Sequence, residues 1–318
     1  MDRLDAMKVF VVTLNEGSLA GASRRLGRSP AAVSRAIAFL ETQVGTELLH
    51  RTTRSLRMSD AGERYAAICR RILIDLEQAE SAAAGEQSAP RGSLTVTAPV
   101  LFGEAVLRPI VDAFLDIYPA VSTRLNLLDR PVNLIDQGVD VSLRIARLTD
   151  SALIAIRVGE VRRVVVASPR YLRTHPEIRE PNDLARHQII ALTELGPDSW
   201  RFPPSDGGTV PHTVQFAPRL ATDSARGAVE SAIEGRGVIC MFLCDIAGQV
   251  RSGELRIVLA KYEPPPIPVH LVLPSGRLSA PKVRAFVDFV VPQLRVHFAR
   301  LAKDLSGRET PCCLQEAI

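Results

Sequence analysis

Apolar side chains near the start of the chain recur at i, i+3, i+4 and i+7, the spacing of an amphipathic helix. The positions are Met7, Phe10, Val11 and Leu14. Ser18 and Ser29 each stand where an N-cap would begin a further helix, and Pro30 suits the first helical position because its missing N–H is not needed there. The pattern predicts one helix after Ser18 and another from Pro30 to about residue 42. Two short helices joined by a turn of three or four residues form a helix-turn-helix.

The last of these helices has two distinct faces. Val33, Ile37 and Leu40 fall on one side at 100° per residue and predict the buried face. The opposite face carries small residues around a single arginine, with a serine at its edge. These exposed positions are Ala31, Ser34, Arg35 and Ala38. Arginine pairs bidentately with guanine in the major groove, so Arg35 is a candidate base reader. Taken alone, Arg35 is equally consistent with an ordinary surface charge.

In the next segment, GTELLHRTTRSLRMSDAG, polar and apolar residues alternate as in strands, and turn residues flank the segment. This pattern favours a two-stranded wing. Threonines at the expected hairpin tip, with arginines on either side, suit contacts to phosphate or the minor groove. These residues are Arg51, Thr52, Thr53, Arg54 and Arg57.

Positive charge is concentrated in this part of the chain. Residues 21–58 contain seven arginines and two glutamates, a net charge of +5, whereas the whole protein carries only +4. Clustered arginine is the electrostatic footprint of a phosphate-binding module, because neutralised phosphates release counterions. A solvated charged face is the alternative explanation for the cluster when it is taken alone.

The runs GSLAGASRRLGRSPAAVSRAIAFLE and LLHRTTRSLRMSDAG, in this order, resemble the winged helix-turn-helix of LysR-type transcription regulators. The resemblance implies recognition of double-stranded DNA by the second helix and the wing. The expected DNA-binding residues are Ser18, Ser29, Pro30, Ala31, Ser34, Arg35, Arg51, Thr52, Thr53 and Arg54. Pro30 and Ala31 stand where many members carry polar base-reading side chains, which favours a larger share for DNA shape readout. Leu49 and Met58-Ser59 also depart from the family pattern, conservatively.

A long helix is predicted after Ser59, because the sequence contains no proline and no glycine beyond Gly62 until residue 85. Its apolar positions step by four and three residues, a heptad seam. The seam positions are Tyr65, Cys69, Ile72, Leu76, Ala79 and Ala83. A coiled coil that pairs two subunits would match a two-fold operator. Packing of the seam on its own domain is the alternative. The resemblance implies the same linker helix and a tetramer built from two dimers.

After the flexible segment 87–93, strands and helices alternate, which predicts mostly parallel sheets covered by helices. Helices are expected over 102–119, 223–235 and 280–302, and residues 131–138 are expected to continue the alternation. The segments LIDQGVDVSLRI, ASPRYLRTHPEIREPNDLARH and GRGVIC resemble the effector-binding domain of the same family. That domain is similar to periplasmic binding proteins, with two α/β lobes and a cleft between them.

The expected fold is therefore α/β, with an α-rich N-terminal winged helix-turn-helix and a C-terminal, two-lobed, periplasmic-binding-protein-like domain. The predicted divisions are a DNA-binding domain (1–60), a linker and dimerisation helix (61–87), an effector-binding domain (92–301) and a disordered tail (302–318). Within the effector-binding domain, lobe one comprises 92–162 and 268–301, and lobe two comprises 163–267.

Ligands of open α/β sheets bind beyond the carboxyl ends of strands, near helix N-termini. The expected effector-binding residues are Thr97, Ala98, Pro99, Val100, Arg144, Ile145, Thr193, Thr222 and Asp223. An anionic small molecule such as a carboxylate is the expected effector, although the apolar Pro99 and Val100 weaken this expectation. Each residue is also consistent with a structural cap or an ordinary loop position.

Other classes of function fit less well. The sequence lacks GxSxG, HExxH, a Gly-Lys pair for a Walker A loop, and cysteines with histidine at zinc spacing, so neither an enzyme nor a metal or cofactor site is expected. An acidic N-terminus and short apolar runs predict no signal peptide and no membrane span, hence a cytoplasmic protein and not a transport-type binding protein. A redox input through Cys240 and Cys244, an absent effector, and contact with RNA polymerase stay open. The expected mechanism couples two sites: binding of the effector closes the cleft between the lobes, and this closure repositions the DNA-binding domains.

Overall fold

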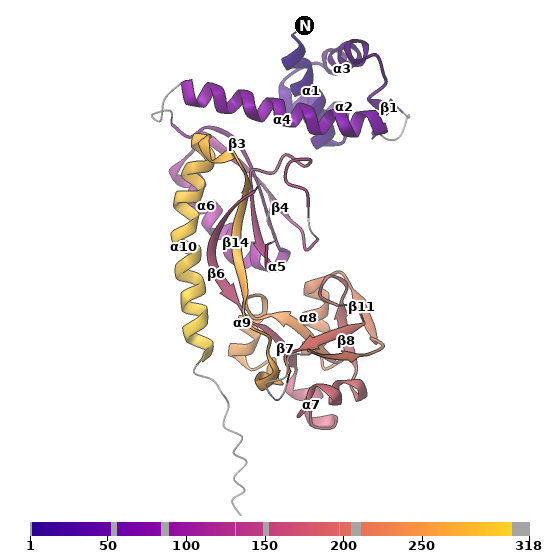
Figure 1. The fold of residues 1–318 in the computed structure, drawn as a ribbon, viewed down its shortest axis with the longest axis vertical. Helices are drawn as coiled ribbons and strands as arrows, with labels where there is room; N and C mark the ends of the chain where they lie inside the picture. The colour runs from indigo at the N-terminus through magenta and orange to yellow at the C-terminus, as the bar shows by residue number, and fades with distance from the viewer. Residues whose placement is uncertain are drawn as a thin grey trace, which may run out of the picture.

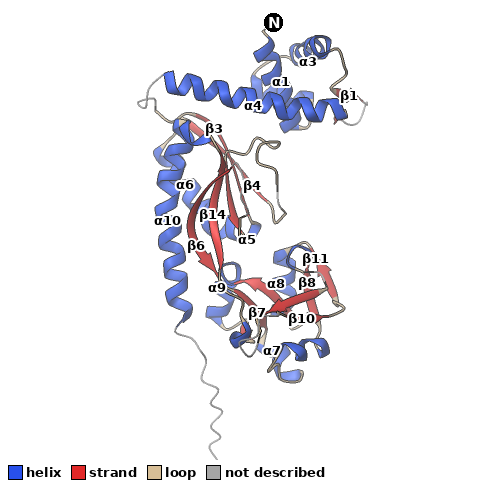
Figure 2. Cartoon of the chain, viewed as in Figure 1, coloured by secondary structure: helices blue, strands red, loops and turns tan. Residues whose placement is uncertain are grey.

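The computed structural model describes residues 2–51, 56–83, 89–130, 132–148, 153–196, 198–204 and 211–306. Figure 1 shows a helical N-terminal domain, the long helix α4 lying across it, and two α/β lobes stacked beyond. Coloured by secondary structure, each lobe is a sheet flanked by helices (Figure 2). No helix in these described ranges is long and apolar enough to cross a membrane.

The N-terminal domain is a winged helix-turn-helix. Its elements are α1 (Arg3–Glu16), α2 (Leu19–Leu26), α3 (Pro30–Val44), β1 (Leu49–Arg51) and β2 (Leu56–Met58). The Ser18 and Ser29 hydroxyls accept hydrogen bonds from Gly21 and Ala32 N–H, as N-caps do. Gly17, Gly27 and Gly45 end the three helices in the left-handed conformation. The predicted starts after Ser18 and at Pro30 are therefore confirmed, and α3 extends two residues further than predicted.

Helix α4 (Asp60–Ala83) packs against α1 with only part of the predicted seam. Cys69 is buried in the N-terminal core and Tyr65 packs against it, so this end of the seam serves its own domain. The side chains of Ile68 and Ile72 are 54% and 37% exposed. Tyr65 and Cys69 therefore fit the alternative of packing on their own domain, whereas Ile72 of the same seam is exposed, and pairing of two subunits through the rest of the seam stays a prediction.

Lobe one is a five-stranded sheet in the order β4-β3-β5-β14-β6. The strands are β3 (Gly92–Ala98), β4 (Val121–Leu127), β5 (Val141–Ile145), β6 (Leu153–Val161) and β14 (Ile267–Pro274). The helices are α5 (Val100–Phe102), the π-helical η1 (Gly103–Leu107), α6 (Arg108–Ile117), the short η5 (Arg277–Ser279) and α10 (Pro281–Ser306). β3 pairs in parallel with β4 and β5, whereas β14 runs antiparallel to β5 and β6.

Lobe two is a second five-stranded sheet in the order β11-β8-β12-β7-β13. Its strands are β7 (Arg163–Ala167), β8 (Ile189–Leu192), β11 (Leu220–Thr222), β12 (Val238–Phe242) and β13 (Arg256–Val258). The helices are α7 (Pro169–Thr174), η2 (Pro181–Arg186), η3 (Thr193–Leu195), α8 (Ala225–Ile233), α9 (Leu243–Ser252) and η4 (Ala260–Tyr262). β9 (Ser199–Phe202) and β10 (His212–Gln215) form a separate hairpin.

Three expectations need correction. Each sheet is mixed and not mostly parallel, because β14 and β7 enter antiparallel to their neighbours. Residues 132–138 form turns and not a further regular element, and the helix expected over 102–119 is divided by the π-helical turn of η1. Helix α10 also continues to Ser306, so residues 302–306 do not belong to a disordered tail.

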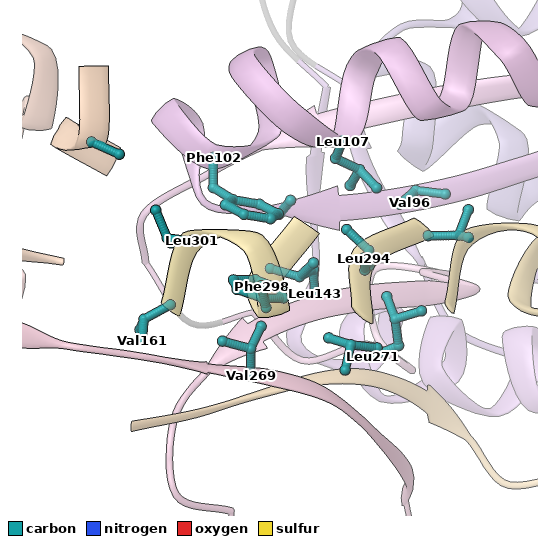
Figure 3. Packing of buried hydrophobic residues seen from close by; sticks show 14 of the residues in the cluster. Val96, Phe102, Leu107, Leu143, Val161, Val269, Leu271, Leu294, Phe298 and Leu301 are labelled. Atoms are coloured by element: carbon teal, nitrogen blue, oxygen red, sulfur yellow. The ribbon is translucent and has the colours of Figure 1, made fainter. Parts of the chain in front are cut away.

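Helix α10 closes one face of lobe one and forms much of its core. Phe298 on α10 stacks on Phe102, with ring centroids 5.3 Å apart and an interplanar angle of 3°. Figure 3 shows these rings beside Leu294, Leu143 and Val269. Each fully buried side chain of this size contributes about 1.5–3 kcal/mol. A Cβ on Gly159 would lie 2.4 Å from Cγ of Phe298, so glycine on β6 is what allows the strand and helix to approach.

Candidate DNA interface and interlobe cleft

The exposed face of α3 follows from its buried face. Val33, Ile37 and Leu40 have no exposed side-chain surface, which anchors α3 to α1 and α2. Pro30, Ala31 and Arg35 are exposed on the other side, and Ser34 is half-buried. The helix therefore presents one guanidinium among small side chains, an arrangement that allows close approach to base edges. Ser18 and Ser29, also nominated for DNA binding, are the N-caps of α2 and α3, so their hydroxyl groups already accept hydrogen bonds from the protein backbone.

Among the clustered arginines whose side chains the structure describes, Arg25 and Arg28 make contacts within the protein. Arg28 makes a double ion pair with Asp5, with Nη2 2.7 Å from Oδ1 and Nη1 2.8 Å from Oδ2. This guanidinium holds the pKa of Asp5 below its usual value. Arg25 Nη2 donates to the Ser93 hydroxyl of lobe one at 2.8 Å. These contacts make Arg25 and Arg28 less available for phosphate binding than the charge count implied. Arg24 and Arg57 are exposed.

The wing is present as a two-stranded hairpin. β1 and β2 pair antiparallel with His50 opposite Arg57 and residue 51 opposite Leu56. Thr52, Thr53 and Arg54, which the sequence nominates for the tip, lie outside the described residues, as does the side chain of Arg51. The hairpin base is fixed to α3 because Glu41 Oε1 accepts from the N–H groups of Leu48 and Leu49 at 2.9 and 3.1 Å.

The lobe-one residues nominated for the effector lie at one edge of the sheet. β3 is parallel to β4 and β5, so Ala98, Leu127 and Ile145 end at the same side. Thr97 and Ala98 are 4% and 2% exposed and belong to the interior, while Pro99 and Val100 are half-buried. Thr97 and Ala98 can therefore shape the cleft floor but offer a ligand little side-chain surface.

The N-terminus of α5 already has an anionic partner from the same chain. Asp129, in the loop after β4, accepts a hydrogen bond from Val100 N–H at 2.9 Å. A carboxylate at a helix N-terminus satisfies a free amide and complements the helix dipole. The sequence analysis did not identify Asp129, because only the parallel pairing of β4 with β3 brings its loop to this place.

Arg144 and Ile145, at the end of β5, have mainly structural contacts. Arg144 Nη2 donates to the Val132 carbonyl at 2.6 Å, and its Nε donates to the Ser142 hydroxyl at 3.4 Å. Burial lowers the pKa of the Arg144 guanidinium. Ile145 packs against the main core. Arg144 keeps a partly buried positive charge beside the cleft, without a carboxylate within ion-pair distance in the part of the chain described.

The lobe-two residues cluster in the same manner. β11 is parallel to β8 with Thr222 opposite Leu192, so Thr193 and Asp223 follow neighbouring strand ends. Thr193 and Asp223 are exposed. Thr222 Oγ1 accepts from Ser224 N–H at 3.0 Å. The N-cap of α8 is Ser224 itself, whose hydroxyl accepts from Gly227 N–H at 3.1 Å. The sequence analysis did not identify Ser224, although a serine directly before the helical segment ARGAV is a typical N-cap signal.

The two lobes contact one another through charged groups. Arg226 on α8 forms an ion pair with Glu104 on η1. Helix α5 contacts both α8 and α9. Asp245 on α9 is half-buried, and desolvation of its carboxyl group together with the charge of Asp129 raises the pKa of Asp245 to about 7. The interlobe surface thus combines one cross-lobe ion pair with two carboxylates that repel one another when both are ionised.

The cysteines are not arranged as a reactive pair. Cys240 is in β12 and Cys244 is in α9, so they do not share a helical face. Arg163 Nε donates to Cys240 Sγ at 3.1 Å, yet burial raises the pKa of the Cys240 thiol. Burial also raises the pKa of Cys244. Buried thiols with raised pKa values are poor nucleophiles. No cluster of three metal-ligating side chains occurs among the residues described.

Comparison with known proteins gives consistent results. The LysR substrate binding domain matches residues 87–295, and the bacterial regulatory helix-turn-helix protein, lysR family, matches residues 4–63. An HTH-type transcriptional regulator of Xanthomonas campestris pv. campestris (strain 8004) is 36% identical over 291 residues, 90% of this chain and 84% of that protein.

Solved full-length structures show the same architecture. The Vibrio cholerae virulence activator AphB, a member of the LTTR protein family, matches with a TM-score of 0.60 and 26% identity over 92% of this chain and 99% of that one. CrgA, a LysR-type transcriptional regulator from Neisseria meningitidis, matches with a TM-score of 0.59 and 29% identity over 91% of this chain and 98% of that one. With its winged helix-turn-helix followed by a two-lobed substrate-binding domain, this chain belongs to the LysR family of transcriptional regulators.

Proposed function

We propose that the protein binds a specific operator through α3 and the wing, and that a small molecule bound between the two lobes changes this binding or the bend of the DNA. The observation that carries the DNA-binding role is the exposed Arg35 among small side chains on the face of α3 opposite its buried anchor. An effector that favours one lobe arrangement shifts the population of that arrangement and so the position of the DNA-binding domains. The site of action is the cytoplasm, where the DNA is.

The cleft residues refine the expected effector. The expectation of a carboxylate depended partly on the N-terminal amide of α5, and Asp129 already accepts from that amide. Glu104 and Asp245 add further carboxyl groups near α5, against the guanidinium groups of Arg226 and Arg144. We therefore favour an effector with a hydrogen-bond donor toward Asp129, whether or not it carries a carboxylate elsewhere. A redox input is disfavoured because desolvation raises the pKa values of the Cys240 and Cys244 thiols.

Assembly through α4 completes the proposed function. Ile68 and Ile72 form an exposed apolar stripe on α4 that a second copy would cover. The resulting two-fold dimer matches two operator half-sites, and the family favours a tetramer of two such dimers. Contact with RNA polymerase would follow from promoter binding.

The first experiment is a gel-shift titration of the purified protein against its own upstream DNA and a random duplex, at two salt concentrations. Tight, salt-sensitive binding to the upstream fragment alone is expected, because phosphate contacts release counterions while base and shape contacts discriminate. Binding to neither duplex at either salt concentration would contradict the DNA-binding role.

A further inference from the structure

A crevice separates the DNA-binding domain from lobe one. Its volume is about 610 Å³, within the range of small-molecule sites. One wall is α4 with Arg64 and Arg70, and the other is β4 with Arg124 and Asn126. This crevice is distinct from the interlobe cleft, because it lies against the N-terminal domain and contains no residue of lobe two.

The crevice offers unmatched hydrogen-bond donors. Arg70 Nε is buried without a hydrogen-bond partner. Neither Arg70 nor Arg64 makes an ion pair within the described ranges of the chain. Burial lowers the pKa of the Arg70 guanidinium, and the charge of Asp136 offsets this only in part. A buried donor without a partner costs about 1–3 kcal/mol, which an acceptor bound there would recover.

A neighbouring ion pair shows that a guanidinium group in this crevice binds a carboxylate. Arg124 Nη2 lies 2.5 Å from the Glu16 carboxylate of the N-terminal domain. Two other carboxylates, Glu63 and Asp136, also line the crevice, and the charge of Asp136 acts on Arg70, so a bound anion must compete with Asp136 for this guanidinium group. Asn126 is available on the facing strand as an additional amide donor.

We propose that this crevice binds a small doubly charged oxyanion, a dicarboxylate or a phosphate, between Arg64 and Arg70 of α4 and Asn126 of β4. Such a ligand joins the two domains and fixes the orientation of the helix-turn-helix on lobe one. Assembly through Ile68 and Ile72 leaves Arg70 accessible, because Arg70 lies about 160° around the helix from each of them, whereas Arg64 lies about 40° from Ile68, at the edge of that stripe.

Isothermal titration of the full chain with succinate, citrate and inorganic phosphate, each at matched ionic strength, tests the proposal. Saturable binding of at least one probe, at one per chain, is expected. Arg70→Gln should weaken it by about tenfold or more, as expected for loss of a charged hydrogen bond. Arg71→Gln is the matched control, because Arg71 is exposed on the same helix and does not line the crevice. It should leave the affinity unchanged.

Asn126→Ala, on the other wall, provides a second test should Arg70→Gln fail to fold, and it should also weaken binding. Arg226→Gln in the interlobe cleft should have no effect. Absence of saturable binding for all three probes, or equal losses in Arg70→Gln and Arg71→Gln, would overturn the proposal. Loss of binding in Arg226→Gln alone would place the anion in the interlobe cleft and also refute it, without affecting the proposed effector function of that cleft.

Discussion

Glu16, the last residue of α1, pairs with Arg124 on β4, with 2.5 Å between Oε1 and Nη2. Together with the hydrogen bond from Arg25 to Ser93, this ion pair joins the DNA-binding domain to lobe one. Any change in the position of the DNA-binding domain relative to lobe one must break or remake these contacts. The side chains of Arg124 and Glu16 are 37% and 23% exposed, respectively, so solvent screens part of their attraction.

We expect a coupling free energy of about 0.5–1 kcal/mol between Glu16 and Arg124. Urea unfolding of Glu16→Gln, Arg124→Gln and the double variant forms a double-mutant cycle that isolates it. If the losses of the two single variants add up to that of the double variant, the pair does not hold the domains together.

The arginines of α3 and the wing should separate into two roles. Arg35→Ala should weaken binding chiefly at the true operator, because it removes a base contact. Arg51→Ala and Arg54→Ala should weaken binding to every duplex and reduce the salt dependence by about one unit per lost phosphate contact. Fluorescence anisotropy with operator and random DNA distinguishes the two. Equal losses on both duplexes for Arg35→Ala would refute its role as a base reader.

Gly62 is required where the wing meets α4. A Cβ there would lie 2.1 Å from the Leu48 carbonyl oxygen, a backbone atom that cannot move aside alone. Gly62→Ala should therefore destabilise the N-terminal domain by about 2 kcal/mol or more. Gly248→Ala in α9 is the control, because a Cβ there meets nothing within 4 Å. It should be neutral or stabilise by up to about 1 kcal/mol, as alanine does in helices. Thermal unfolding measures both.

The desolvated carboxyl group of Asp245 should make stability depend on pH. Its pKa rises from 3.8 to about 7 on folding, so the folded state binds more protons than the unfolded state between these values. The free energy of unfolding should then fall as pH rises from about 4 to 7. Asp245→Asn mimics the neutral form and should match the wild type near pH 5 but exceed its stability at pH 8. The exposed Asp288→Asn is the control. An identical pH dependence in wild type and Asp245→Asn would contradict this account.

The exposed stripe of α4 should govern assembly. Ile72→Glu places a charge where a second copy would pack and should shift the protein toward monomers in light scattering after size exclusion. Arg71→Gln on the adjacent exposed face should leave the oligomer intact. Unchanged mass for Ile72→Glu would place the subunit interface elsewhere.

Local signals in the sequence were enough to predict the N-terminal domain. Serine N-caps, Pro30 at a first helical position, glycine ends and apolar spacing each act within a few residues, so they can be read without knowing the fold. Gly62 could not be assigned a reason, because the carbonyl of Leu48 approaches it only after the wing has folded.

The sheets were predicted less well because strand direction depends on distant partners. The pattern of β14 indicates a strand, but not that it enters between β5 and β6 antiparallel to both. The seam of α4 illustrates the same limit, since its spacing could not decide whether Cys69 faces α1 or a second subunit.

By itself, the sequence determined which segments of the N-terminal domain are helices and strands. It also determined the two-part architecture and the family of the whole protein. All of these depend on short-range periodicity, capping and motif order. Only the tertiary structure decided which charges meet. Asp129 at the start of α5, Arg226 with Glu104 and Glu16 with Arg124 are all separated by long stretches of chain. Pairing between such distant groups is set by the packing of whole elements, which no local pattern encodes.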